Sequence, residues 1–380
     1  MNRAMARQRR QAGLGSVRAM RAMRATIIAG GIALASAPGA TAATPALGLS
    51  LQAPQSVAAG SGGAFYISDF ENDVIERVSA AGQATIVAGT GNFGTPTPGA
   101  ATSSDLDYPV GVAVSTGGDL YIADFGNSVV ERVTPSGTLS VVAGIPGRSG
   151  SPTPGVATRS MLTGPVGVAV DQHGNVYIAD QGVQFGTGDV VEKVTAQGRL
   201  SIVAGEVSAS GVPTPGPATR SMLDYPQDVA VDRSGNLYIA DGNNVIEKVN
   251  SAGTLSIYAG VLGGGTGLPT PGPATQSRFN SPDGVATDAA GDVFVADRGN
   301  DEIEEITTAG RLSIVAGTGA PGVPTAGPAL RSMLDQPTGV SVDASGDVYV
   351  ADTANNLVDE VSAGGVLSIV AGQRPTALLG

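Results

Sequence analysis

The sequence contains no cysteine, no tryptophan and a single histidine among its 380 residues. Without cysteine the chain has no disulfide, no thiol nucleophile and no site for a lipoprotein anchor. The one histidine, His173, lies in a short turn that also holds Gly174. A lone histidine in a turn is a poor general base, so we expect no Ser-His-Asp triad.

Charged residues are also scarce, at 14 % of the chain, whereas hydrophobic residues make up 42 % and glycine alone contributes 56 residues. A disordered chain would be poor in apolar residues and highly charged. Abundant glycine and valine instead favour short buried strands that are joined by tight turns.

The N-terminus has the pattern of an export signal. Seven arginines precede the apolar run 25–35, which is too short to span a bilayer, and Ala40-Thr41-Ala42 follows as a cleavage site. We predict a signal peptide over residues 1–43 and a secreted or periplasmic protein, with an N-terminal membrane anchor as the alternative. We expect no transmembrane segment after signal removal.

The charge of the remaining chain argues against one class of partner. The whole chain has a net charge of −12, and removing the seven arginines of the signal leaves −19. Phosphate backbones and anionic lipids would repel so acidic a body. We therefore expect no nucleic-acid partner.

One sequence unit is repeated six times. Its marker is the stretch Asp-Leu-Tyr-Ile-Ala-Asp at residues 119–124, and a proline lies 15 residues before the final aspartate of every copy. Successive copies are 55, 56, 61, 56 and 55 residues apart, and a fixed period of this length indicates a solenoid, a propeller or an array. The final aspartates are Asp69, Asp124, Asp180, Asp241, Asp297 and Asp352.

Each unit contains four short runs with the composition of β-strands. In the second unit these runs are 109–114, 119–124, 129–134 and 138–143, separated by Gly, Ser and Asn. Because the strands are apolar on both sides, the pattern favours blades sandwiched between other blades over a solenoid. We predict an all-β fold, a six-bladed β-propeller of four-stranded antiparallel blades within residues 44–380. The blades fall at about 51–105, 106–161, 162–222, 223–279, 280–334 and 335–380.

The recurring polar residues have structural interpretations. We expect the six aspartates and the asparagines after them to cap the following loops, with a cation site as the alternative. The asparagines are Asn72, Asn127, Asn244, Asn300 and Asn356.

The third strand carries an acid in every unit, and we expect these acids to form a solvated outer face. A base follows the acid in the first four units, but Glu305 and Glu360 replace it in the last two. A cationic partner could bind this acidic sector. The acids of the row are Glu76, Glu131, Glu192, Glu247, Glu304 and Asp359.

Proline-rich connections of about 20 residues link the units. We expect a rigid crossing followed by a helical turn, such as 220–223, whose Met or Leu fills the gap between blades. Ring closure has three candidates: an added strand from residues 44–51, an added strand from 374–380, or direct packing of blade one on blade six.

The repeat resembles the NHL-repeat family of six-bladed propellers, in particular its exported bacterial members. The resemblance rests on the runs Pro-x-Gly-Val-Ala-Val-Asp and Gly-Asn-x-Tyr-Ile-Ala-Asp and on the Ala-Gly that ends the repeat, best seen at 165–205 and 226–260. It extends over about residues 51–373. It implies a domain that presents a face to proteins or other ligands more than it catalyses.

We therefore predict a monomeric binding scaffold for a protein or small-molecule ligand. Its binding face would carry the loops between second and third strands and the inter-blade crossings. One such loop, residues 181–189 in blade three, is five residues longer than in blade two. Large side chains in loops are the usual anchors of binding, and the candidates are Phe70, Phe125, Phe185, Arg298, Tyr108 and Tyr225.

Two other functions remain open. The first is a propeller hydrolase or lyase with a carboxylate-bound divalent metal in the central channel, which three converging carboxylates or amides would favour. No catalytic residue and no cofactor other than such a cation can be named. The second is a structural or surface-coat role, which the repetition and the Pro/Gly content would fit.

Overall fold

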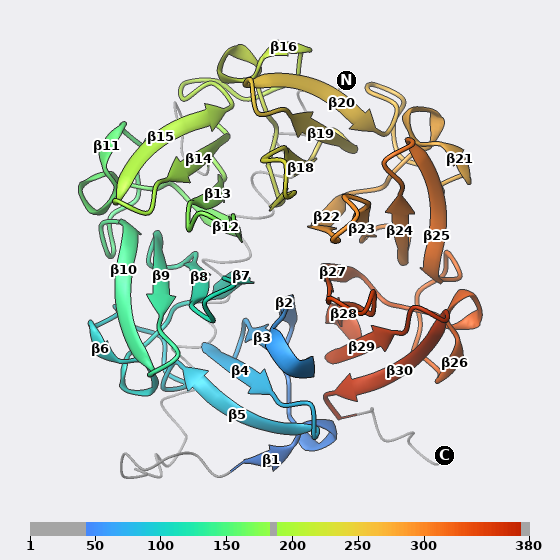
Figure 1. Ribbon diagram of the computed structural model, residues 1–380, viewed down its shortest axis with the longest axis horizontal. Coiled ribbons are helices and arrows are strands. Elements are labelled where there is room, and N and C mark those ends of the chain that lie inside the picture. The colour runs from blue at the N-terminus through green and yellow to red at the C-terminus, as the bar shows by residue number, and fades with distance from the viewer. Residues whose placement is uncertain (1–42, 183–187, 374–380) are drawn as a thin grey trace, which may run out of the picture. The chain divides into compact units, whose positions relative to one another are not determined.

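Six antiparallel sheets follow one another along the chain and stand as blades around a central axis (Figure 1). The computed structural model describes residues 43–182 and 188–373, and residues 41–380 form one compact unit. The predicted six-bladed all-β propeller is confirmed. The predicted number of strands is wrong by one, because every sheet has five strands rather than four.

The innermost strands line the axis and need small residues there. A Cβ atom on Gly111 would lie 2.4 Å from the carbonyl oxygen of Val166 in the next blade, and one on Gly339 would lie 2.7 Å from the Cα of Ser56. Neighbouring backbones therefore approach too closely for any side chain at these positions. The innermost strands are β2 (Pro54–Ala59), β7 (Pro109–Val114), β12 (Pro165–Val170), β17 (Asp228–Val231), β22 (Pro282–Thr287) and β27 (Pro337–Val342).

The second strands carry the repeated motif and are covered on both faces. All five residues are buried in five of these six strands, as expected for a sheet that is packed between two neighbours. The second strands are β3 (Phe65–Asp69), β8 (Leu120–Asp124), β13 (Val176–Asp180), β18 (Leu237–Asp241), β23 (Val293–Asp297) and β28 (Val348–Asp352).

The third and fourth strands pair across a register shift in every blade. Such a bulge increases the twist. The third strands are β4 (Val74–Val78), β9 (Val129–Val133), β14 (Val190–Val194), β19 (Val245–Val249), β24 (Glu302–Ile306) and β29 (Leu357–Val361). The fourth strands are β5 (Gln83–Ala88), β10 (Thr138–Gly144), β15 (Arg199–Ala204), β20 (Thr254–Ala259), β25 (Arg311–Gly317) and β30 (Val366–Ala371).

The fifth strand is the element that the sequence pattern missed. It is a dipeptide from the connection before each blade, and it pairs with the start of the fourth strand of that blade. Two residues are too few to show any hydrophobic periodicity. The fifth strands are β1 (Thr44–Pro45), β6 (Gly99–Ala100), β11 (Gly155–Val156), β16 (Gly216–Pro217), β21 (Gly272–Pro273) and β26 (Gly327–Pro328).

A single 3-10 turn follows each fifth strand. The turn expected at 220–223 lies earlier, at Ala218–Arg220, and Leu223 after it is fully buried between blades. The apolar plug is therefore Leu or Phe, whereas Met161 and Met333 stay exposed. These turns are η2 (Ala46–Gly48), η4 (Ala101–Ser103), η5 (Ala157–Arg159), η6 (Ala218–Arg220), η7 (Ala274–Gln276) and η8 (Ala329–Arg331), and two others are η3 (Ser61–Gly63) and η9 (Thr353–Asn355).

Within residues 43–182 and 188–373 the ring closes without an exchanged full-length strand, and the candidate strand 374–380 lies outside the described residues. Residues 44–51 add the short strand β1 to blade 1, and the carbonyl oxygen of Ala46 accepts a hydrogen bond of 3.0 Å from the backbone N–H of Gly372 in blade 6. The equivalent hydrogen bond between blades 1 and 2 runs from the backbone N–H of Gly89 to the carbonyl oxygen of Ala101, at 3.1 Å. The N-terminal segment thus acts as the connection between blades 6 and 1, and β2 packs directly on β27. No described helix is both long and apolar enough to cross a bilayer.

Candidate functional site

Each motif aspartate holds the connection that leads into its own blade. A carboxylate oxygen of every one accepts the backbone N–H of the residue 17 positions earlier, at 2.8–3.1 Å. This bond explains the constant offset between the proline and the aspartate. The donor and acceptor pairs are Gln52 and Asp69, Asp107 and Asp124, Thr163 and Asp180, Asp224 and Asp241, Asn280 and Asp297, and Asp335 and Asp352.

The asparagines after the motif divide into two roles. The amides of Asn72, Asn127 and Asn300 donate to the motif aspartate of their own blade at 2.6–2.8 Å, as expected for a loop cap. The side chains of Asn244 and Asn356 instead accept backbone N–H groups of the next blade, from Ser281 at 2.7 Å and from Ala53 at 2.8 Å. Their neighbours Asn243 and Asn355 make the local bond.

The predicted solvated face of acids on the third strands is wrong. Those acids are at most 5 % exposed, because each blade is covered on both faces by its neighbours. Each acid lies beside the motif aspartate of its blade. The pairs are Asp69 and Glu76, Asp124 and Glu131, Asp180 and Glu192, Asp241 and Glu247, Asp297 and Glu304, and Asp352 and Asp359.

The pairs titrate far from their ordinary range. Burial raises the pKa of Glu131 well above its usual value, and the charge of Asp124 raises it further. Burial also raises the pKa of Asp124 to about 7, against the opposing effect of the Asn127 amide. Two carboxylates cannot donate to one another, and the described residues offer the oxygens of Glu131 no donor. One proton held within the pair makes one carboxyl a donor and removes one buried charge.

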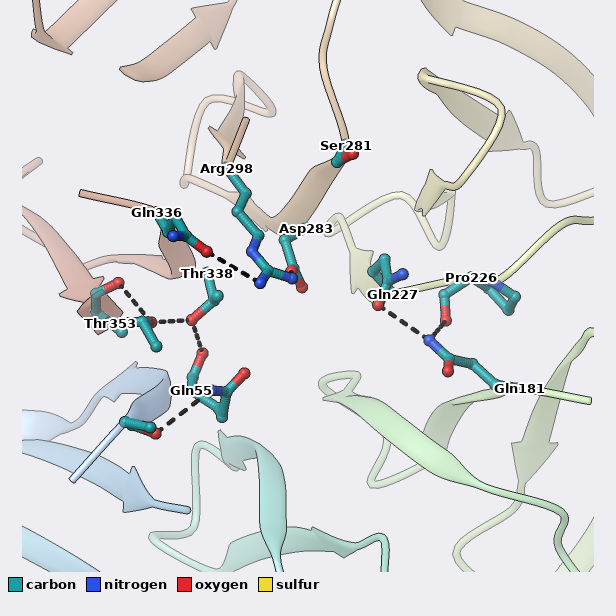
Figure 2. A network of polar contacts seen from close by, with 12 residues as sticks. Gln55, Gln181, Pro226, Gln227, Ser281, Asp283, Arg298, Gln336, Thr338 and Thr353 are labelled. Carbon is teal, nitrogen blue, oxygen red and sulfur yellow. Dashed lines mark hydrogen bonds and ion pairs between the residues drawn. The ribbon is translucent and has the colours of Figure 1, made fainter. Parts of the chain in front are cut away.

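At the mouth of the central channel, equivalent positions of the six units carry different residue types. The residue after each repeat proline lies at or just before the start of the innermost strand of its blade, and four of these residues are polar while two are valine. Several polar ones belong to the network of Figure 2. The six residues, in blade order, are Gln55, Val110, Val166, Gln227, Asp283 and Thr338.

The polar part of this mouth contains a charged group. The guanidinium of Arg298 lies 3.5 Å from the carboxylate of Asp283 and donates to the side-chain oxygen of Gln336 at 3.1 Å (Figure 2). Burial raises the pKa of Asp283 to about 6, although Arg298 opposes the shift. Nearby Asp228 replaces the usual small residue of the innermost strand and accepts the N–H of Val285, and burial raises its pKa to about 7.

Uncharged hydrogen bonds extend the polar part on both sides. The amide of Gln181 donates to the side chain of Gln227 at 2.9 Å, and the hydroxyl of Thr338 donates to the carbonyl oxygen of Gln55 at 2.7 Å (Figure 2). This second bond also joins blade 6 to blade 1.

Aromatic and aliphatic groups occupy the opposite part of the mouth. The rings of Phe70 and Tyr108, from blades 1 and 2, lie 4.7 Å apart. Phe125 packs with Val110 against the core cluster that contains Val166. The residues after the repeat prolines are therefore apolar in blades 2 and 3 and polar in blades 4, 5, 6 and 1.

A family model for the NHL repeat matches residues 106–130, 223–244 and 334–358. The chain is an NHL-repeat propeller. Human NHL repeat-containing protein 3 is 34 % identical over 138 residues, which are 34 % of each chain. Mouse Teneurin-1 is 25 % identical over 364 residues, which cover 84 % of this chain and 12 % of that relative, so the chain spans about an eighth of its length.

The fold also resembles that of a solved enzyme. A streptogramin B lyase structure superposes with a TM-score of 0.51 at 17 % identity, over 87 % of this chain and 86 % of the lyase. At this identity the likeness shows the fold alone.

The predicted binding residues of this NHL-repeat propeller occupy two equivalent positions. Phe70, Phe125 and Arg298 directly follow a motif aspartate, and Tyr108 and Tyr225 directly precede a repeat proline. The structure thus places all five at the same end of the blades. Tyr108 is only 2 % exposed and mainly supports Phe70. The sixth, Phe185, lies outside the described residues.

The ring of residues after the repeat prolines was not among the predicted binding residues. A signal was present, because Gln55, Gln227, Asp283 and Thr338 vary at a position whose neighbours are nearly constant. Only a comparison of the six units, column by column, would have shown it.

The donors at the mouth do not fit a carboxylate-bound divalent cation. Asp283 is paired with a guanidinium and both carboxylate oxygens of Asp228 accept backbone N–H groups. Within 43–182 and 188–373, no three His, Cys, Asp or Glu side chains are grouped so that they could hold a metal ion.

Proposed function

We propose that this NHL-repeat propeller is a binding scaffold and that its ligand binds across the channel mouth. One observation carries the proposal: the residues at the mouth differ in character from blade to blade, while the four long strands and the motif aspartate recur in every blade. Structural needs would act equally on all six units. A mouth that is apolar on one side and charged on the other is adapted to an asymmetric ligand.

The ligand that such a mouth fits is a protein loop or a small molecule with an apolar part and a polar part. The apolar part would lie on Phe70 and Phe125, and a hydrogen-bonding or anionic group would reach Arg298. The guanidinium is about half exposed and already oriented by Asp283, so it loses little freedom on binding.

A matched set of variants tests the proposal. Proteins that the immobilised chain captures from exported material, and small molecules that shift its melting temperature, would be titrated against Phe125→Ala, Arg298→Ala and Arg233→Ala. Arg233 is an exposed arginine in a turn at the other end of the blades. A hot spot costs at least about 2 kcal/mol when truncated, so we expect the first two variants to weaken binding about 30-fold. Equal affinities of all three variants would exclude the mouth.

We also infer export, on the basis of the arginine-rich start, the apolar run and the Ala-Thr-Ala site. The mass of the mature protein would give its N-terminus, which we expect close to Ala42. An exported protein that retains residues 1–40 would contradict cleavage and favour an anchor.

A further inference from the structure

A groove lies between blades 5 and 6, at the end of the blades opposite the channel mouth. This blade 5–6 groove has a volume of about 570 Å³. Phe294, Glu305 and Val315 of blade 5 form one wall, and Val348 of blade 6 forms part of the other. Asp288 lies at its rim, and none of its described lining residues is basic.

The equivalent groove between blades 4 and 5 is smaller, and a lysine of the chain lines it. Its volume is about 280 Å³. The ammonium of Lys248 lies 5.0 Å from the ring centre of Tyr238 and 5.4 Å from that of Tyr258. Blade 3 repeats the arrangement, with Lys193 5.1 Å from the ring centre of Tyr177. The fold itself therefore shows what this groove accommodates: an ammonium group over an aromatic ring.

Blade 5 lacks the lysine but keeps the rest of the arrangement. Glu305 stands at the position of Lys248, and Val315 stands where Tyr258 lies in blade 4. The exchange of a long cation for an acid, and of tyrosine for valine, both enlarges the groove and reverses its charge.

The carboxylate of Asp288 at the rim also lacks the neutral hydrogen-bond donors that its counterpart has in blade 4. In blade 4, Asp232 accepts the amide of Asn236 at 2.7 Å and the hydroxyl of Tyr238 at 3.3 Å on one oxygen. In blade 5 those two donors are replaced by Asp292 and Phe294. A carboxylate and a phenyl ring cannot donate, so Asp288 keeps acceptor capacity on the side that faces the groove. Burial, Asp292 and Asp288 together raise the pKa of Glu305, as expected for negative charge without a nearby cation.

Blade 6 carries the same acid beside a bulkier neighbour. Glu360 occupies the lysine position there, but the ring of Phe65 from blade 1 lies 4.9 Å from the ring of Tyr349. Phe65 therefore takes the room that a ligand would need.

We propose that the blade 5–6 groove binds a lysine side chain of a partner protein. Its ammonium would lie over Phe294 between the carboxylates of Asp288 and Glu305, and its alkyl stem would pack on Val315. A protein is favoured over a small amine because Leu330 and Val366 flank the groove and are 58 % and 51 % exposed. Apolar residues next to the lysine would cover them. The proposal does not depend on the ligand at the channel mouth.

In the test, a fluorescent hexapeptide with two lysines between leucines is titrated with the full chain. Fluorescence anisotropy measures the binding of the peptide. The control peptide replaces both lysines by norleucine. Glu305→Lys reproduces the arrangement of blade 4, so it should keep the melting temperature and lower the affinity at least about tenfold. Glu206→Lys makes the same charge change at an exposed site away from the groove, and we expect less than a twofold effect.

Several results would overturn the proposal. The first is that the lysine peptide does not bind up to about 1 mM. The second is that the norleucine peptide binds equally well, and the third is that Glu305→Lys and Glu206→Lys lose equal affinity for the lysine peptide. Butylamine serves as the small-amine probe. If butylamine binds as tightly as the peptide, the groove recognises small amines and not a partner protein.

Discussion

At the scale of single residues, the molecule is marked by its six buried carboxyl pairs. Buried acids usually have a basic partner, whereas here a second acid lies beside each one. A proton shared within the pair provides the missing donor. The pairs also tie the third strand of each blade to the aspartate that holds the incoming connection.

These pairs predict that the propeller becomes less stable as pH rises. Their folded pKa values lie above the unfolded ones, and that of Asp124 rises from 3.8 to about 7. The folded state therefore holds more protons than the unfolded state in this range. The contribution of the carboxyl pairs to the free energy of unfolding is complete below about pH 4 and is lost as pH rises through 7. We expect the melting temperature to be higher at pH 5 than at pH 8.

Glu131→Gln tests the cause of this dependence. The amide supplies Asp124 with a permanent donor and removes a titrating group, so we expect a gain of about 1–3 kcal/mol at pH 8 and little change at pH 5. Thermal unfolding at both pH values measures it. The exposed Glu206→Gln is the control. A variant that is destabilised equally at both values would show that the pair needs its second carboxyl for another reason.

At the scale of elements, the decisive contact is between neighbouring innermost strands. The small residue at the start of each one lets the next backbone approach, and the chain departs from glycine only at Ser56 and Asp228. Each of these accepts a backbone N–H of the following blade, from Val112 and Val285 respectively. The exceptions thus replace close approach with a hydrogen bond.

We expect Gly339→Ala to destabilise the propeller. Its Cβ would lie 2.7 Å from the Cα of Ser56, and backbone atoms on both sides would have to move. Overpacking of this kind costs about 1–3 kcal/mol, to be measured by denaturant unfolding. The control is Gly364→Ala, because the nearest atom to its added Cβ is 3.7 Å away. Similar unfolding free energies for the two variants would contradict the close-packed axis.

At the scale of the whole molecule, the ring depends on a segment that comes before the first blade. Residues 44–51 serve blade 1 as the internal connections serve the other blades. Leu51 and Ala46 are buried in the same cluster as Tyr349 and Ala371 of blade 6. The apolar contact and the Ala46–Gly372 hydrogen bond hold the two ends of the ring together.

Two leucines of this segment allow a matched test of closure. Leu51 is 4 % exposed and Leu47 is 59 % exposed. Leu51→Ala should cost about 2–5 kcal/mol, and Leu47→Ala should stay within about 0.5 kcal/mol. Denaturant unfolding measures both. If the two variants are equally stable, the N-terminal segment does not close the ring.

The number of blades, their four long strands and the end of the blades at which Phe70, Phe125 and Arg298 lie could all be predicted from the sequence. These features follow from local patterns repeated at a fixed period, and six copies reinforce one another. A structural role of the motif aspartates could also be predicted, because a carboxylate before a turn has few other uses, but their bond to the residue 17 positions earlier could not.

Solvent exposure and contacts between distant residues, by contrast, depend on how the blades pack together. The acids on the third strands look exposed by alternation, yet Glu131 is buried because the next blade covers that face. The two-residue strands, the closure through Ala46 and the pairing of Asp283 with Arg298 join residues that are far apart or too few to form a pattern. The grooves at Glu305 and at Glu360 carry the same acid. Ring closure brings Phe65 of blade 1 against Tyr349, whereas the groove at Glu305 has Val348 in that place.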